Sequence, residues 1–110
     1  MTKIINRITQ KIIIEDENLS IKELVEKAVK EKISLCDANL RGADLEYADL
    51  RYADLEYANL RDTNLNGTDL RGADLRYANL RDAKMNEDQL IYLAKSKNIE
   101  IINKKENDNT

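Results

Sequence analysis

Carboxylates recur at a fixed interval in the middle of this 110-residue chain, and their spacing raises the question of chemistry first. The series consists of Asp44, Asp49, Asp54, Asp69 and Asp74, which lie at multiples of five residues from one another. Such a series could supply paired acids for catalysis or a ladder of ligands for Ca²⁺. Repeats that bind Ca²⁺ need glycine-rich turns, however, and the chain has only three glycines. We therefore expect these carboxylates to accept hydrogen bonds from backbone turns and to hold no metal.

Nucleophilic catalysis finds no support in the sequence either. The chain contains no histidine, so neither its serines nor the single Cys36 has an evident base partner. Cys36 cannot form an internal disulfide, which suits a reducing compartment, and we interpret it as an outward-facing thiol without a role. The sequence thus predicts no enzyme activity, no catalytic residue and no cofactor.

A five-residue repeat positions these side chains. Leucine occupies every fifth position from Leu35 to Leu80, and the series ends at Met85. Two positions earlier stands alanine in most units, with Ile33, Thr63 and Thr68 in the others. Five residues advance an α-helix by about 500°, so successive leucines would form no stripe on a helix. In a flat strand an odd period would place them on alternating faces. A chain that turns a corner every five residues keeps all of them inside, so the period predicts a solenoid.

The repeat unit, as in Ala43-Asp44-Leu45-Glu46-Tyr47 and Ala73-Asp74-Leu75-Arg76-Tyr77, resembles the consensus of the pentapeptide-repeat family. Consecutive units fill residues 33–85, about half of the chain. The resemblance implies a mainly β fold, a right-handed quadrilateral parallel β-helix with four repeats in each coil. Residues twenty positions apart would then stack in columns along the solenoid.

The segment before the repeats, residues 1–32, is predicted to cap the first coil. Two β-branched runs on either side of Thr9-Gln10 predict short strands around a turn. Ser20 and Glu23 have the spacing of a capping box and predict the start of a helix with one apolar face. This head resembles that of small pentapeptide-repeat proteins from phages and prophages, although such relatives usually have glycine where Gln10 stands.

The segment after the repeats is predicted to cap the last coil, because an open coil end exposes unpaired backbone and apolar core. Asn86 can begin a helix that carries Leu90, Ile91, Leu93 and Ala94. A short strand at 99–102 completes this cap, which we place at 86–102. The polar residues 103–110 predict a disordered tail.

The tyrosines suggest a binding surface. With four repeats in a coil, three of them occupy consecutive corners and the fourth lies one coil further on, beside an acidic side of the coil. Tyrosine is enriched at protein interfaces, which favours an exposed patch for a protein partner. The candidate surface patch consists of Tyr47, Tyr52, Tyr57, Tyr77, Asp54, Glu56 and Asp74.

A structural role competes with this interpretation for two of the tyrosines. Gly67 would stack on Tyr47, and Gly72 on Tyr52. An aromatic ring over a glycine shields the bare backbone from water. We favour this role for Tyr47 and Tyr52, and the sequence leaves both interpretations open.

Basic and amide side chains form further columns on the outside. Asn39, Asn59 and Asn79 would align as an amide ladder, which stabilises stacked strands. Beside it runs a column of Arg41, Arg61 and Arg81, whose mutual repulsion Asp62 and Asp82 would relieve.

Two classes of function remain. The first is a non-enzymatic structural or protein-interaction module with an unknown protein partner. The second follows from the resemblance, because some relatives imitate duplex DNA and bind DNA gyrase or topoisomerase. Duplex DNA carries about one phosphate per 1.7 Å, whereas residues 33–85 hold ten acidic and seven basic residues, a net charge of −3. Mimicry therefore ranks second.

The composition sets the remaining expectations. No apolar run approaches the roughly 20 residues that a membrane span requires, and no signal peptide is evident. We expect a cytoplasmic protein without membrane contact and without direct nucleic-acid binding. Dimerisation of two identical chains through the apolar terminal caps stays open.

Overall fold

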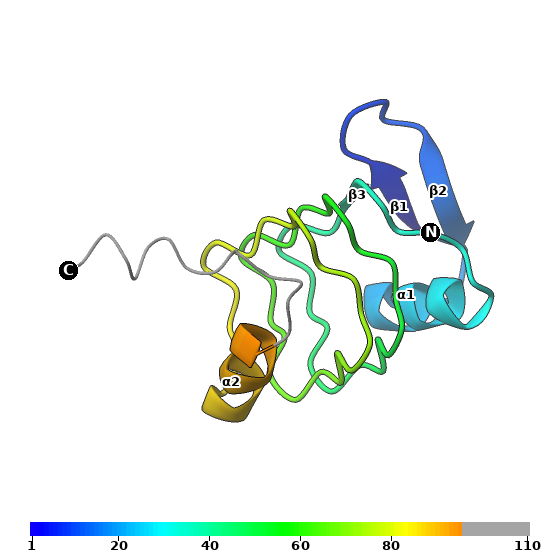
Figure 1. Ribbon diagram of the computed structural model, residues 1–110. Coiled ribbons are helices and arrows are strands. Elements are labelled where there is room, and N and C mark those ends of the chain that lie inside the picture. The colour runs from blue at the N-terminus through cyan, green and yellow to red at the C-terminus, as the bar shows by residue number, and fades with distance from the viewer. Residues whose placement is uncertain (96–110) are drawn as a thin grey trace.

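The computed structural model describes residues 1–95, and Figure 1 shows stacked coils between a helix at each end. Its elements are β1 (Thr2–Asn6), β2 (Ile12–Asp16), α1 (Ile21–Lys30), β3 (Ala38–Asn39) and α2 (Glu87–Lys95). The strand predicted at 99–102 and the tail predicted at 103–110 lie outside the described residues. Among residues 1–95, neither helix has the length and apolarity needed to cross a membrane.

Every fifth residue of the repeat turns a corner in the left-handed backbone conformation, with φ between 61° and 75°. We call these the corner residues: Asp37, Gly42, Tyr47, Tyr52, Tyr57, Asp62, Gly67, Gly72, Tyr77 and Asp82. Within each unit the Asp or Asn side chain accepts a hydrogen bond from the N–H two positions on, as Asp44 does from Glu46 at 3.2 Å. The prediction that these side chains serve backbone turns is confirmed.

Backbone hydrogen bonds join each coil to the next. Leu40 N–H donates to Asn59 O and Asn59 N–H donates to Ala38 O, both at 2.9 Å. Isolated parallel bridges link positions 20 apart, from Asn39 with Asn59 to Asn64 with Lys84. One coil therefore contains four five-residue units.

The expected parallel β-helix is seen only in part. Between two corners the chain stays extended for so short a distance that one bridge forms on each side of the coil, and no long parallel strand develops. The named strands instead form a three-stranded sheet in the order β2-β1-β3, whose pairs are both antiparallel.

The leucines fill the inside of the coils, as the period predicts. From Leu35 to Leu75 each of them is at most 5% exposed. Thr63 and Thr68 replace alanine inside and satisfy their hydroxyls by donating to Leu60 O and Leu45 O at 2.8 and 2.7 Å. The last coil is less well covered, since Leu80 and Met85 are only half-buried.

The N-terminal segment closes the first coil with backbone and side chains. Strand β1 pairs with β3, which places Ile5 opposite Asn39 on the first coil. Helix α1 begins with the predicted capping box of Ser20 and Glu23. Its buried face joins the leucine core through Leu24, Val25 and Ala28. In the hairpin turn Gln10 adopts φ +65°, so a residue with a side chain takes the left-handed position.

The C-terminal helix covers less than its sequence predicts. Asn86 and Gln89 exchange the two hydrogen bonds that cap α2, at 2.8 and 2.9 Å. Of the predicted apolar face, Leu93 is buried, whereas Leu90 and Ile91 are 37% and 49% exposed. Leu93 therefore contributes more to the cover of the last coil than Leu90 and Ile91 do. The helix contacts two corners of the coil, because Gln89 accepts a hydrogen bond from the Gly67 N–H at 3.3 Å and the Tyr92 hydroxyl accepts one from the Gly72 N–H at 3.1 Å.

Replacing Leu60 by Ala should lower the free energy of unfolding by about 2–5 kcal/mol, because the side chain is fully buried in the coils. Replacing the exposed Arg41 by Ala should change it by about 0.5 kcal/mol or less. Urea denaturation of both variants tests this. Equal losses would mean that the inward and outward positions are wrongly assigned.

A chain that lacks residues 1–32 should aggregate. The deletion removes β1 and the buried face of α1, and so leaves the backbone edge and the leucines of the first coil uncovered. Sedimentation velocity of the truncated and full-length chains measures the effect. A truncated chain that sediments as a folded monomer would show that the first coil needs no cap.

Candidate functional site

Three acidic residues of the predicted patch lie together on one side of the solenoid. This acidic face consists of Asp54, Glu56 and Asp74, and one carboxylate oxygen of each lies within 4.8 Å of one from each of the other two. The corner residues Tyr52 and Tyr57 stand at its two ends on the same coil. The sequence separates Asp54 from Asp74 by 20 residues, and the coil period brings them side by side.

Neighbouring side chains already neutralise part of the acidic face. Arg76 binds the Asp74 carboxylate with Nε and Nη2 at 3.0 and 2.8 Å and lies 3.8 Å from Glu56. This hydrogen bond holds the pKa of Asp74 below its usual value. Ser34 donates its hydroxyl to Asp54 at 2.7 Å. A cation at this place would have to displace Arg76, so the arrangement suits an ion-pair network better than a metal site.

The thiol of Cys36 lies near these acids. The side chain is half-buried, where the sequence predicts an outward-facing thiol. Burial raises the thiol pKa, and the charges of Asp37, Asp54 and Glu56 raise it further. Because the thiolate is the reactive form, Cys36 is a poor nucleophile at neutral pH.

Two of the tyrosines pair with each other. The rings of Tyr57 and Tyr77 stack across adjacent coils, with centroids 5.1 Å apart and an angle of 16° between their planes. Both rings keep a large exposed surface. Both residues are corner residues, and the Tyr57 N–H donates to Arg76 O of the next coil at 3.0 Å.

The other two tyrosines each cover a glycine. A side chain at Gly67 would overlap the ring of Tyr47, and one at Gly72 would overlap the ring of Tyr52. Only glycine fits beneath these rings, and both glycines also adopt positive φ. The rings nevertheless remain 71% and 80% exposed. Shielding of a glycine and presentation of an aromatic surface are thus compatible at these corners.

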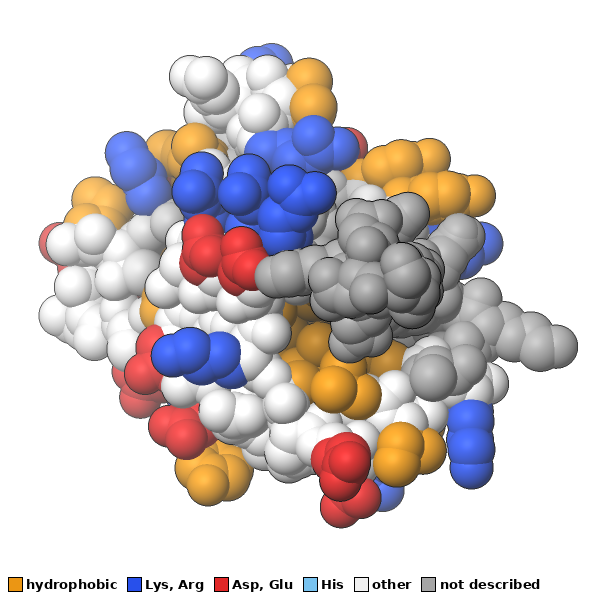
Figure 2. Space-filling view, turned by 90° about the vertical axis from the view of Figure 1, so that its left-hand side faces the viewer, with side chains coloured by type: hydrophobic (Ala, Val, Ile, Leu, Met, Phe, Trp, Pro, Cys, Tyr) orange, Lys and Arg blue, Asp and Glu red, His pale blue; other side chains and the backbone are white. Residues whose placement is uncertain are grey.

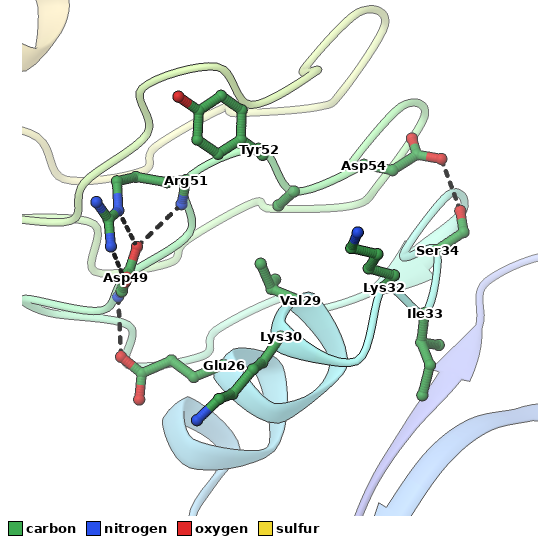
Figure 3. Close-up of a pocket in the computed structure, with 11 residues that line it drawn as sticks. Glu26, Val29, Lys30, Lys32, Ile33, Ser34, Asp49, Arg51, Tyr52 and Asp54 are labelled. Carbon is green, nitrogen blue, oxygen red and sulfur yellow. Dashed lines mark hydrogen bonds and ion pairs between the residues drawn. The ribbon is translucent and has the colours of Figure 1, made fainter.

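An open groove lies between α1 and the edge of the first coil (Figure 3), with a volume of about 910 Å³. Val29 and Ile33 approach it from the helix and the segment that follows, and Tyr52 and Ala53 from the coil. Two residues of the predicted patch, Tyr52 and Asp54, line it. Reasoning from the sequence missed this groove, because no repeat position shows where α1 stops covering the coil.

Charged side chains fix one end of the groove (Figure 3). Glu26 of α1 accepts a hydrogen bond from the Asp49 N–H at 2.8 Å, which ties the helix to the coil. Arg51 binds the Asp49 carboxylate through Nε and Nη2 at 2.8 and 2.9 Å. Mainly through this hydrogen bond, Arg51 lowers the pKa of Asp49 to about 2.

Comparison with known proteins agrees with this architecture. The family model for pentapeptide repeats, eight copies long, matches residues 31–56 and 53–87. A search of curated proteins found no match. The matched residues make up more than half of the chain and coincide with the coils and the turns that lead into and out of them. The chain therefore belongs to the pentapeptide-repeat family.

Proposed function

We propose that this chain is a non-enzymatic protein-interaction module. Its solenoid is the right-handed quadrilateral parallel β-helix of the family, with residues 1–32 and 86–102 as caps on the repeats at 33–85. The partner binds at the tyrosine-flanked acidic face and the adjoining groove. The observation that carries this proposal is the exposure of Tyr52 on a fixed corner that lines an open groove.

The composition of this surface supports a protein partner. Interfaces are enriched in tyrosine, and their centres combine apolar contact with a few oriented polar groups. The groove offers Val29 and the exposed Tyr52 as apolar contacts, with Asp54 beside them. Because the rings of Tyr57 and Tyr77 already stack on each other, binding at these two side chains would cost little side-chain entropy.

The electrostatics of the same surface do not support catalysis. A general acid or base works best with a pKa near the operating pH. Arg76 instead lowers the pKa of Asp74, and burial raises that of the Cys36 thiol. Both shifts move these groups away from proton transfer at neutral pH.

DNA mimicry stays the second candidate. The net charge of the repeats is small, because arginines offset much of the charge of the acidic residues. Asp49, Asp69 and Asp74 each accept two hydrogen bonds from the arginine two positions on. A mimic has to present phosphate-like charge at a density that this surface does not reach.

A photo-crosslinking amino acid should locate the interface. Benzoylphenylalanine in place of Tyr52 keeps an aromatic ring at the groove and should give a discrete adduct with one protein in extracts of the native host. The same amino acid in place of the exposed Ile91, on α2 at the far end of the coils, should not give that adduct. Gel mobility and mass spectrometry identify the products. Identical adducts from both positions, or none from position 52, would contradict the proposed interface.

Purified gyrase should supercoil plasmid DNA at the same rate with and without micromolar concentrations of this protein. The reason is the low charge density of the repeats, which is insufficient to compete with duplex DNA. Salt-sensitive inhibition in this assay would promote DNA mimicry above the protein-interaction function.

A further inference from the structure

Two columns of arginine run along opposite sides of the coils, and they differ in the residue two positions earlier. Arg51 and Arg71 follow Asp49 and Asp69. Each guanidinium binds the preceding carboxylate with two hydrogen bonds, at 2.8 and 2.9 Å for Arg51 and at 2.8 and 2.6 Å for Arg71. This is the paired column. Its positive charge is neutralised within the same repeat unit.

The other column, Arg41, Arg61 and Arg81, follows asparagine instead of aspartate. We call it the open arginine column. The preceding amide oxygens, those of Asn39, Asn59 and Asn79, accept from the backbone N–H groups of the arginines at 3.1–3.2 Å. An amide carries no charge, so the local bidentate ion pair of the paired column cannot form. The amide oxygens serve the turns, and parallel bridges align Asn39 with Asn59 and Asn59 with Asn79 across the coils.

The guanidinium groups of the open arginine column have spare donors. Arg41 contacts Asp62 only through Nε, at 3.4 Å. The Nε of Arg61 is buried and has no hydrogen-bond partner. Arg81 forms no ion pair with any of residues 1–95. Figure 2, seen from the side of the last coil, shows basic side chains gathered together with acidic ones directly beside them.

The distance between successive arginines of the open arginine column determines which secondary structure of a partner can match it. Its arginines lie 20 residues apart, one coil each, and neighbouring strands are about 4.8 Å apart. Along an α-helix, positions i, i+3 and i+7 rise by about 4.5 and 10.5 Å, close to one and two coils. Same-face residues of an extended strand are about 6.7 Å apart and lose register after the first coil.

We propose that the open arginine column docks the acidic face of a partner α-helix, with carboxylates at i, i+3 and i+7. The guanidinium fork matches a carboxylate bidentately. The proposal deepens the protein-interaction function by adding a second surface, and it rests on that function only in requiring a protein partner. The groove and the open arginine column lie on opposite sides of the coil, so each can fail without the other.

The charges around the column favour separate carboxylates over a phosphate backbone. Asp62 and Asp82 stand at the corners next to the arginines, and the whole chain has a net charge of −3. A continuous polyanion would meet these acids and the acidic face nearby. A helix with acids at three positions meets the arginines and presents neutral side chains elsewhere.

The test uses an alanine-rich helical peptide of about 18 residues with Glu at i, i+3 and i+7, and a matched peptide with Gln there. Titration of the ¹⁵N-labelled full-length chain at low salt should shift the Nε–H signals of Arg41, Arg61 and Arg81. Replacing all three by Gln should raise the Kd about tenfold, since three ion pairs at or near the surface are lost. Replacing all three by Lys should give an intermediate loss, because lysine keeps the positive charge but cannot form the bidentate hydrogen bonds of a guanidinium group.

The paired column provides the matched control. Arg51→Gln with Arg71→Gln removes the same chemistry at the same coil spacing and should leave the Kd within twofold. The dispersion of the amide spectrum shows whether each variant is folded, and Arg81→Gln alone serves if the triple variant is not. Equal weakening by the paired-column variant, or equal binding of the Gln peptide, would overturn the proposal. So would a short DNA duplex that binds the column more tightly than the peptide.

Discussion

The left-handed corner at every fifth residue is the constraint on which the rest of this structure depends. Non-glycine residues seldom adopt positive φ, yet here Tyr, Asp and Gly take the same conformation at successive corners. The strain persists because each corner is held on several sides. The small residue donates to the leucine carbonyl three positions earlier, and the straight segments pair with the next coil. Without these corners, the leucines would not all face the same core.

Stacked corners convert sequence position into surface position. Because residues 20 apart lie in one column, a change in the outward residue of one unit has a defined neighbour above and below. Tyr57 stacks on Tyr77 in this way, and Tyr47 lies over Gly67. The glycine has no side chain because the ring of the previous coil occupies that space. The surface is therefore built in columns, and a binding site on it is a set of adjacent columns.

The choice between Asp and Asn at the outward polar position has two consequences of different kinds. In both residues the side-chain oxygen accepts a hydrogen bond from the backbone N–H two positions on, so the turn forms in either case. Only Asp can also bind the guanidinium of the arginine that follows, as Asp49 does with Arg51. One side of the solenoid is thereby neutralised and the other is left with free donors, although the fold is the same on both.

The sequence by itself determined the solenoid, the inward leucines and the capping box of Ser20 and Glu23, because each follows from a period or a local hydrogen bond. It also predicted that Tyr47 and Tyr52 stack on glycines, once the coil length was taken from the family. Contacts between α1 and the coil needed the tertiary structure: the groove beside Tyr52 arises where the helix stops covering the coil edge. The same holds for α2. Its helical pattern is evident in the sequence, but its contacts with the corners at Gly67 and Gly72 are not, because a helix's direction depends on contacts that no repeat encodes.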